Sequence, residues 1–302
     1  MIRIGFHMSI AGSVANAPIS AALHGYTAFQ MFTESSRRWI GRGINAGGAS
    51  AFRETVKAAD LLPYAHIPYL SNPSSPNAEV HSKSIGMIVR NMENCSMLGV
   101  GYLVLHIGSH IGAGAKVGVA NVCDALGKVL DSSGKVRILL ENSAGYRNSV
   151  GSRFEEIGEV IDRVGSGRIG LCLDTCHTFA AGYDLGSAEG IERTVGELDR
   201  TIGLRRLKLV HLNDSRFGLG SGLDRHWHIG KGRIGMRGFV ELFRNRAFRS
   251  GSFIMETPVN GEGDNASNLR AAVEAISTAG ASLYRQRSGV IQEDGVGRDH
   301  RD

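Results

Sequence analysis

The sequence predicts an α/β protein built as one (β/α)₈ TIM barrel, and three observations favour that fold. Eight β-type runs recur along the chain, and their starts are 23 to 45 residues apart, which leaves room for a helix in each gap. Several runs, such as "LVL", "ILL" and "LCL", are apolar on both faces, as in a parallel sheet covered by helices. No G-x-G-x-x-G turn follows the first run, which disfavours an open doubly wound sheet.

The expected elements alternate regularly along the chain. Strands are predicted at 3–9, 26–32, 61–67, 102–107, 137–142, 169–174, 207–214 and 252–257. Helix-like segments fill the gaps at 13–24, 49–60, 77–98, 115–130, 153–164, 188–201, 237–247 and 265–279. We interpret residues 1–280 as a single catalytic domain. Residues 281–302 are polar, charged and Gly-containing, so we expect a disordered C-terminal tail there.

Composition sets the broad class of the protein. Hydrophobic residues make up 42% and charged residues 21% of 302 residues, which is typical of a globular protein. A net charge of +5 weakly favours a polyanionic partner such as nucleic acid. The first residues lack the apolar core of a signal peptide, and no apolar run approaches the roughly 20 residues needed to span a membrane. With four cysteines and no C-x-x-C pair, we expect a reduced, cytoplasmic protein that does not bind membranes.

A His or a carboxylate stands at or near the end of six of the eight predicted strands. In a barrel these ends converge on the face where active sites lie. Buried imidazoles and carboxylates gathered around one axis would repel one another or stay unsatisfied without a cation. The pattern therefore predicts a metal site, with candidate ligands His66, His106, Glu141, Asp174, His177, His211 and Glu256.

The candidate ligands favour zinc, because imidazole with carboxylate suits that ion, although manganese and iron share the preference. The thiols of "LCLDTCH" are the competing ligands. Alternation places Cys172 one layer below Asp174, in the packed interior, and Cys176 in the following turn. We interpret both thiols as structural, and the alternative that one of them binds metal stays open.

A second cluster lies in the Gly-rich loop after the seventh strand, "HLNDSRFGLGSGLDRHWHIGKGRIG". The spacing of Asp224 and His226 lets both side chains point the same way from an extended segment, as ligands must. A flexible polar surface loop is the alternative. Counted with the strand-end set, nine side chains suit two or three ions. Three divalent ions against four carboxylates leave an excess of positive charge that would attract a phosphate.

The motifs together resemble the endonuclease IV family of abasic-site endonucleases over about residues 2–280. The matching segments are "GFHMSIAGSVANA", "HIPYLSN", "HIGSH", "LLENSAG", "LDTCHTFAAGYDL", "HLNDS", "GSGLDRHWHIGKGRIG" and "METP", in the family's order. One departure is Ile107, where a Pro is common in the family. The resemblance implies a (β/α)₈ barrel with three zinc ions. Such an enzyme hydrolyses the phosphodiester 5′ to an abasic site in duplex DNA and leaves a 3′-hydroxyl and a 5′-deoxyribose phosphate.

The resemblance also implies a role for each candidate residue. His66 and His106 match ligands of the first zinc, and Glu141 matches the carboxylate that bridges the first and second. The remaining ligands of the second zinc are Asp174, His211 and Glu256, and those of the third are His177, Asp224 and His226. Glu141 and Glu256 are the expected catalytic residues, since both would hold or orient the attacking hydroxide. Residues matching positions that enter the DNA are Arg37, Tyr69 and Leu70.

Two other functions stay open. A metal-dependent sugar isomerase or epimerase can use the same barrel, but it would not need Asp224 and His226. A metal-dependent DNA-binding protein without catalysis would need a lost ligand, and all nine are present. We expect a monomer, because no segment of the sequence indicates an interface.

Overall fold

The computed structural model describes residues 1–35, 38–41, 43–132, 134–261 and 263–284. Its central feature is an eight-stranded parallel sheet in the order β1-β10-β7-β6-β5-β4-β3-β2. The strands are β1 (Ile2–Phe6), β2 (Ala28–Phe32), β3 (Leu62–His66), β4 (Tyr102–His106), β5 (Arg137–Glu141), β6 (Ile169–Asp174), β7 (Leu207–His211) and β10 (Gly251–Met255). The predicted TIM barrel is therefore confirmed.

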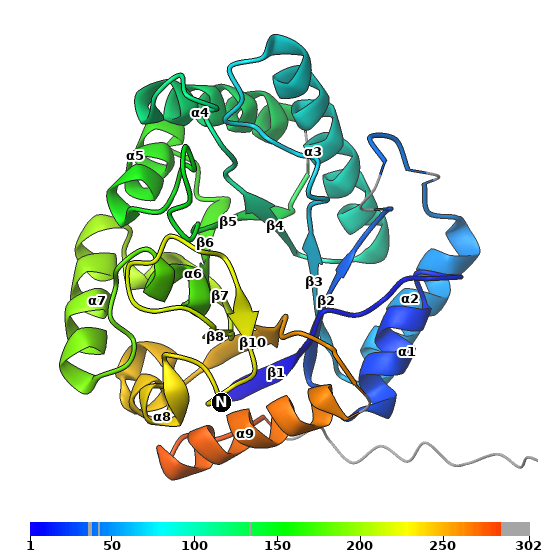
Figure 1. The fold of residues 1–302 in the computed structure, drawn as a ribbon. Coiled ribbons are helices and arrows are strands. Elements are labelled where there is room, and N and C mark those ends of the chain that lie inside the picture. The colour runs from blue at the N-terminus through cyan, green and yellow to red at the C-terminus, as the bar shows by residue number, and fades with distance from the viewer. Residues whose placement is uncertain (36–37, 42, 133, 262, 285–302) are drawn as a thin grey trace, which may run out of the picture.

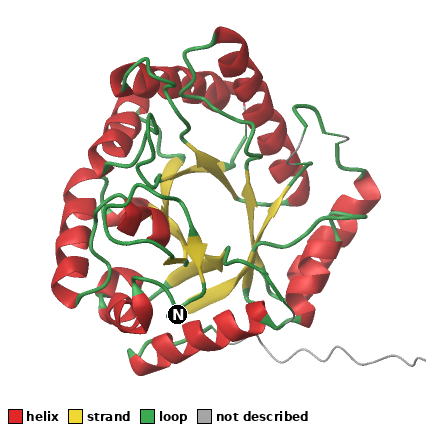
Figure 2. Cartoon of the chain, in the orientation of Figure 1, coloured by secondary structure: helices red, strands yellow, loops and turns green. Residues whose placement is uncertain are grey.

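Helices form a ring around these strands, as Figures 1 and 2 show. They are α1 (Asn16–Leu23), α2 (Ala46–Ala58), α3 (Ala78–Leu98), α4 (Ala115–Ser132), α5 (Phe154–Val164), α7 (Ala188–Thr201), α8 (Gly235–Arg244) and α9 (Asp264–Thr278). Each lies within a few residues of its predicted segment. The barrel closes between β1 and β2, where the N–H of Thr27 donates to the carbonyl of Ile4 and that of Met8 donates to the carbonyl of Gln30.

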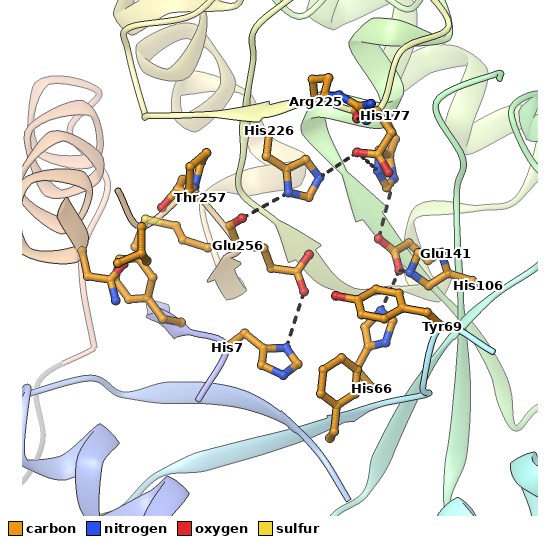
Figure 3. Close-up of a pocket in the computed structure, with 17 residues that line it drawn as sticks. His7, His66, Tyr69, His106, Glu141, His177, Arg225, His226, Glu256 and Thr257 are labelled. Carbon is orange, nitrogen blue, oxygen red and sulfur yellow. Dashed lines mark hydrogen bonds and ion pairs between the residues drawn. The ribbon is translucent and has the colours of Figure 1, made fainter. Parts of the chain in front are cut away.

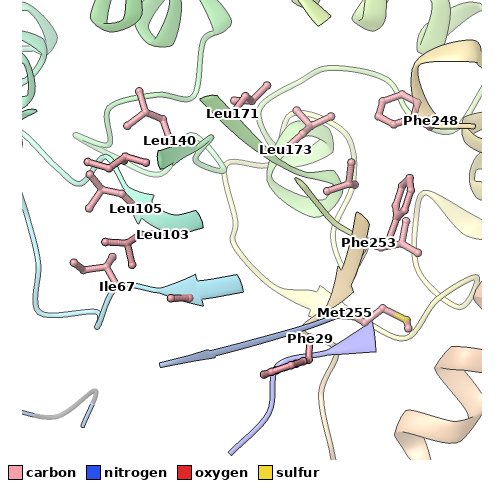
Figure 4. Close-up of a cluster of buried hydrophobic side chains, with 14 of the residues drawn as sticks. Phe29, Ile67, Leu103, Leu105, Leu140, Leu171, Leu173, Phe248, Phe253 and Met255 are labelled. Carbon is pink, nitrogen blue, oxygen red and sulfur yellow. The ribbon is translucent and has the colours of Figure 1, made fainter. Parts of the chain in front are cut away.

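The barrel interior is filled by one side chain from each of seven strands. Ala28, Tyr64, Val104, Leu139, Cys172, Leu209 and Ile254 form this inner cluster, and all are buried. The intervening residues, such as Leu103 and Leu105 of β4, face the helices and join the larger outer core (Figure 4). Because strand side chains alternate, the residue two positions after each inner-cluster member points into the barrel again, one layer nearer the carboxyl ends of the strands.

Two local features differ from the prediction and lie over the mouth of the barrel. A short helix, α6 (Thr175–Ala180), directly follows β6, where the sequence predicts a turn. The seventh strand ends at His211 and not at residue 214, because β8 (Asp214–Ser215) pairs antiparallel with β9 (His226–Trp227) in a separate two-stranded sheet. Figure 1 shows both features inside the ring of helices.

The described residues extend into the first part of the segment that the sequence predicts as a tail. Leu283 forms a parallel bridge with Ile2, and the N–H of Tyr284 donates to the Ile2 carbonyl at 2.7 Å. The Arg3 guanidinium lies 3.7 Å from the centre of the Tyr284 ring. Apolar and aromatic side chains at these two positions therefore hold the chain beside β1. Residues 285–302 lie outside the described residues. Within the described residues, no helix is long and apolar enough to cross a membrane.

Candidate metal centre

One layer of side chains at the mouth of the barrel carries the polar groups. The residues two positions after the inner cluster are Gln30, His66, His106, Glu141, Asp174, His211 and Glu256. His7, directly after β1, joins the layer two residues after Gly5. Gly5 itself leaves room for the neighbouring strand, because a Cβ added there would lie 1.8 Å from the Ala28 carbonyl oxygen. The layer opens into a cavity of about 550 Å³, lined also by His177, Asp224 and His226 (Figure 3).

The first group of candidate ligands joins β3, β4 and β5. The Nε2 atoms of His66 and His106 lie 3.0 and 3.2 Å from Oε2 of Glu141. Nδ1 of His66 lies 2.7 Å from the Ile67 carbonyl, to which it donates, so in the neutral ring Nε2 is left as the ligating atom. The three ligand atoms are close enough to share one cation.

The second group surrounds His211, whose side chain is completely buried. Its Nδ1 lies 3.0 Å from Oε1 of Glu141, 3.2 Å from Oε2 of Glu256 and 3.9 Å from Oδ2 of Asp174. Glu141 thus offers one oxygen to this group and the other to the first group. That arrangement is what a carboxylate bridging two cations requires.

The third group comes from α6, from the β8–β9 loop and from β9 itself. Oδ1 of Asp224 lies 3.2 Å from Nε2 of His177 and 3.5 Å from Nε2 of His226. The Nδ1 atoms of these rings contact the carbonyls of Asn142 and Glu256, so both Nε2 atoms face the same point. Asp174 lies between the second and third groups, because its Oδ2 is also 3.4 Å from Nε2 of His226.

The donor set fits metal ions better than it fits a hydrogen-bonded network. Within the described residues, the Nε2 atoms of His177 and His226 are buried without a well-aligned hydrogen-bond partner. Buried ring nitrogens that face carboxylates without a well-aligned hydrogen bond are rare unless they have a functional role. Among the described residues, three groups of ligand atoms lie close enough to share a cation: His66, His106 and Glu141; Glu141, Asp174, His211 and Glu256; and Asp174, His177 and His226. The predicted ligand Asp224 is outside these groups, although its Oδ1 lies beside His177 and His226, and neither Cys172 nor Cys176 belongs to any of them. Burial raises the pKa of the Cys172 thiol to about 12, which disfavours the thiolate that metal binding needs.

The electrostatics of the site lead to the same conclusion. Burial opposes charging of His177, but the carboxylates of Asp174, Asp224 and Glu141 outweigh it and raise the pKa of the ring to about 10. Burial likewise opposes ionisation of Glu141, but the imidazoles of His106 and His211 hold the pKa of that carboxyl well below its ordinary value. The carboxylates thus attract positive charge, and a divalent ion can replace the protons on the rings.

Two asparagines that the sequence analysis did not single out orient the ligands. Nδ2 of Asn213 donates to Oδ2 of Asp174 at 2.7 Å, and its Oδ1 accepts the N–H of Glu256. Asn142 accepts the N–H of Asp174 through Oδ1 at 2.8 Å. Both lie within two residues of the carboxyl end of a strand, in "LLEN" and "HLND". Their proximity to the candidate ligands in the sequence could have identified them as residues that orient a ligand.

Asp214, also outside the candidate set, anchors the segment that follows β9. Its buried carboxylate accepts the N–H groups of Gly232 and Ile234 at 2.9 and 3.0 Å. Gly232 is required for this approach, since an added Cβ would lie 2.5 Å from Oδ1 of Asp214.

Replacing Asp214 by asparagine should lower the free energy of unfolding by about 2–3 kcal/mol, because an amide N–H₂ would then face backbone donors. Urea unfolding at one fixed zinc concentration measures this. Asp162→Asn, on the exposed face of α5, is the matched control and should change stability by less than about 0.5 kcal/mol. Equal stability of the two variants would contradict the anchoring role.

The residues expected to enter DNA lie in different settings. Tyr69 is 72% exposed at the rim of the cavity, and its ring lies 5.5 Å from that of Phe32. Leu70 is half-buried and packs against the outer core. Arg37 lies outside the described residues.

Comparisons with known proteins agree with this geometry. Residues 19–279 match the family described as xylose isomerase-like TIM barrel. The chain is 44% identical over 273 residues to a probable endonuclease 4 of Methanoculleus marisnigri, across 89% of this chain and 97% of that protein. It is 40% identical over 283 residues to a probable endonuclease 4 of Geobacter sulfurreducens, across 91% and 96% of the two chains.

Solved structures give a consistent result. Endonuclease IV from Thermus thermophilus superposes with a TM-score of 0.81 at 37% identity, across 91% of this chain and 99% of that one. A D-tagatose 3-epimerase-like protein superposes with a TM-score of 0.72 across 92% and 98%, but at 20% identity it shows a shared fold alone. On these identities over nearly the whole of both chains, the protein belongs to the endonuclease IV family.

Proposed function

We propose that the protein is a zinc-dependent endonuclease that cleaves duplex DNA on the 5′ side of abasic sites, leaving a 3′-hydroxyl and a 5′-deoxyribose phosphate. The observation that carries this proposal is the set of three adjoining ligand groups, linked through Glu141 and Asp174, at the floor of an open cavity. Nitrogen and carboxylate donors in this ratio favour zinc, and three groups favour three ions. We further propose that the enzyme acts as a cytoplasmic monomer.

The ions, when bound, supply Lewis-acid chemistry that offsets the charge of the phosphate and activates water at neutral pH. The protein's part is to fix the geometry in which this happens. Glu141 spans two ligand groups from the end of β5, and its side chain is only 1% exposed, so it cannot reorient freely. Glu256, directly after β10, accepts a hydrogen bond from Gln30 at 2.7 Å, and its own N–H donates to Asn213. These contacts support the proposal that the two carboxylates hold and orient the nucleophile.

The third ligand group lies on the more open side of the cavity. Nearly half of the Asp224 side chain is exposed, whereas His177 is buried beside it. This difference suits a phosphate arriving from solvent. Arg225 lines the same wall and adds a positive charge for the DNA backbone.

Tyr69 is proposed to stack on a base at the lesion. Tyr69→Ala should lower kcat/KM on abasic duplex about 5- to 150-fold, the range of about 1–3 kcal/mol for one aromatic–base stack. Tyr69→Phe keeps the ring and should cleave like the wild type. The measurement is steady-state nicking of a labelled oligonucleotide duplex. Equal rates for Tyr69→Ala and the wild type would remove Tyr69 from the DNA contact, and Leu70→Ala in the same assay tests its neighbour.

The deciding experiment uses a duplex with a single tetrahydrofuran abasic analogue and an otherwise identical undamaged duplex. Zinc-loaded protein should cut only the first, at the 5′ phosphodiester, and elemental analysis should give close to three zinc ions per chain. An intact abasic strand with three zinc ions bound would refute the nuclease function. One metal per chain and turnover of a ketose would instead support the sugar epimerase alternative.

A further inference from the structure

Gln30 is the neutral member of the polar layer at the barrel mouth. It lies on β2 two residues after Ala28 of the inner cluster, and its side chain is completely buried. In the equivalent position, six other strands present a His or a carboxylate of the candidate metal centre. A buried amide has four hydrogen-bonding positions, so its partners reveal what it does there.

The contacts of Gln30 fix which way its amide points. One end lies 2.7 Å from Oε1 of Glu256, and an ionised carboxylate can only accept, so this end is the donor Nε2. The acceptor Oε1 therefore lies against Nε2 of His211, at 2.8 Å. The reverse orientation would bring two acceptor oxygens together at Glu256. Glu256 thus determines the proton arrangement of His211 through Gln30.

The proton on Nε2 determines the state of the other ring nitrogen of His211, Nδ1. With its proton on Nε2, the neutral imidazole presents a lone pair at Nδ1, the atom that faces Glu141, Asp174 and Glu256. The opposite tautomer would direct an N–H toward the cation position. Gln30 also leaves Oε2 of Glu256, 3.2 Å from Nδ1, free for the same cation.

His7 completes the arrangement from the end of β1. Its Nδ1 lies 3.1 Å from Nε2 of Gln30, so His7 accepts the second amide hydrogen there. Nδ1 of His7 is also 3.6 Å from Oε1 of Glu256. Both amide hydrogens and the amide oxygen of Gln30 therefore have hydrogen-bond partners. Flipping the amide, so that its oxygen and nitrogen exchange places, would lose these hydrogen bonds.

We propose that Gln30 is a positioning residue that locks His211 in the Nε2-protonated tautomer and holds Glu256, so that both offer their free atoms to the cation at the second ligand group. This inference rests on the proposed zinc-dependent function, but it concerns metal binding and not DNA cleavage. Because Gln30 and His211 are completely buried, solvent cannot replace a lost partner between them.

Gln30→Met roughly keeps the volume of the side chain and removes every side-chain hydrogen bond. We expect it to weaken one of the zinc sites about 10- to 100-fold, the usual cost of losing a group that orients a ligand. Competition with a chelator of known zinc affinity, with zinc counted per chain, measures this. The matched control is Met31→Leu, a buried neighbour on β2 that faces the outer core and should bind zinc like the wild type.

A second measurement needs no variant. In zinc-loaded wild type labelled with ¹⁵N-histidine, His211 should show a proton on Nε2 and none on Nδ1. A proton on Nδ1, or unchanged zinc affinity in a folded Gln30→Met, would overturn the proposal. Neither result depends on nicking, so a wild type that fails to cut abasic DNA would refute the proposed function while leaving this inference to be judged on metal binding alone.

Discussion

Glu141→Gln is expected to lower the nicking rate on abasic duplex by about 10³-fold or more, on the scale of removing a preorganised transition-state contact. The reason is the position of its carboxylate. One oxygen lies 3.0 and 3.2 Å from His66 and His106, and the other lies 3.0 Å from His211. An amide carries no charge and presents one oxygen only, so it can serve one ligand group at most.

Zinc content should fall with activity in this variant, from three ions per chain to two or fewer. Glu159→Gln is the control, because it removes an exposed carboxylate that pairs with Arg163 at 3.1 Å and should leave both quantities unchanged. Nicking by Glu141→Gln within tenfold of the wild type would show that the two ligand groups act independently.

Removing the metal should cost stability as well as activity. Each ion that binds only the folded chain adds about 4 kcal/mol when its free concentration is about 1,000 times its dissociation constant. Chelator-treated protein should therefore lose nicking and unfold at a lower temperature. Zinc should restore both, and magnesium should not, because it prefers oxygen ligands in octahedral geometry.

The ions should also leave in order. The Asp224 side chain is 45% exposed, against 1% for Glu141, so the third group is the more accessible to a chelator. Stepwise titration, followed by zinc count and differential scanning calorimetry, should detect one early loss before the main fall in unfolding temperature. A melting temperature that stays the same with and without zinc would contradict a structural contribution of the ions.

The strand-end pattern predicts much of the candidate site because the residues with polar, metal-binding side chains recur at regular places in the fold. His66, His106 and Glu141 each end a short apolar run, and the barrel brings such ends together. The search for a His or a carboxylate at a strand end does not identify His7 or Gln30. The sequence predicts that the first strand continues to residue 9, but it ends at Phe6, and Gln30 lies within β2. Barrel strands tilt and stagger, so one layer meets them at different distances from their ends.

Other differences have local causes. α6 has six residues, too few for a helical period to be visible in the sequence, and Asp174 starts it by accepting the N–H of His177. The predicted seventh strand is too long because "HLND" continues the run, whereas the Asp214 carboxylate accepts backbone N–H groups of a distant loop. Long-range contacts of this kind produce no hydrophobic periodicity in the sequence, so a sequence pattern cannot predict them.

The two carboxylate oxygens of Asp174 contact different ligand groups, so the number of residues in "DTCH" fixes how those groups are spaced. Oδ1 accepts the N–H of His177 at 2.8 Å, while Oδ2 faces His226 and His211. One turn of backbone therefore sets how far apart the second and third ligand groups lie. An inserted residue would rotate His177 by about 100° around the α6 axis. An insertion or deletion in this turn would therefore move the third ligand group away from the second, even though the rest of the barrel kept its fold.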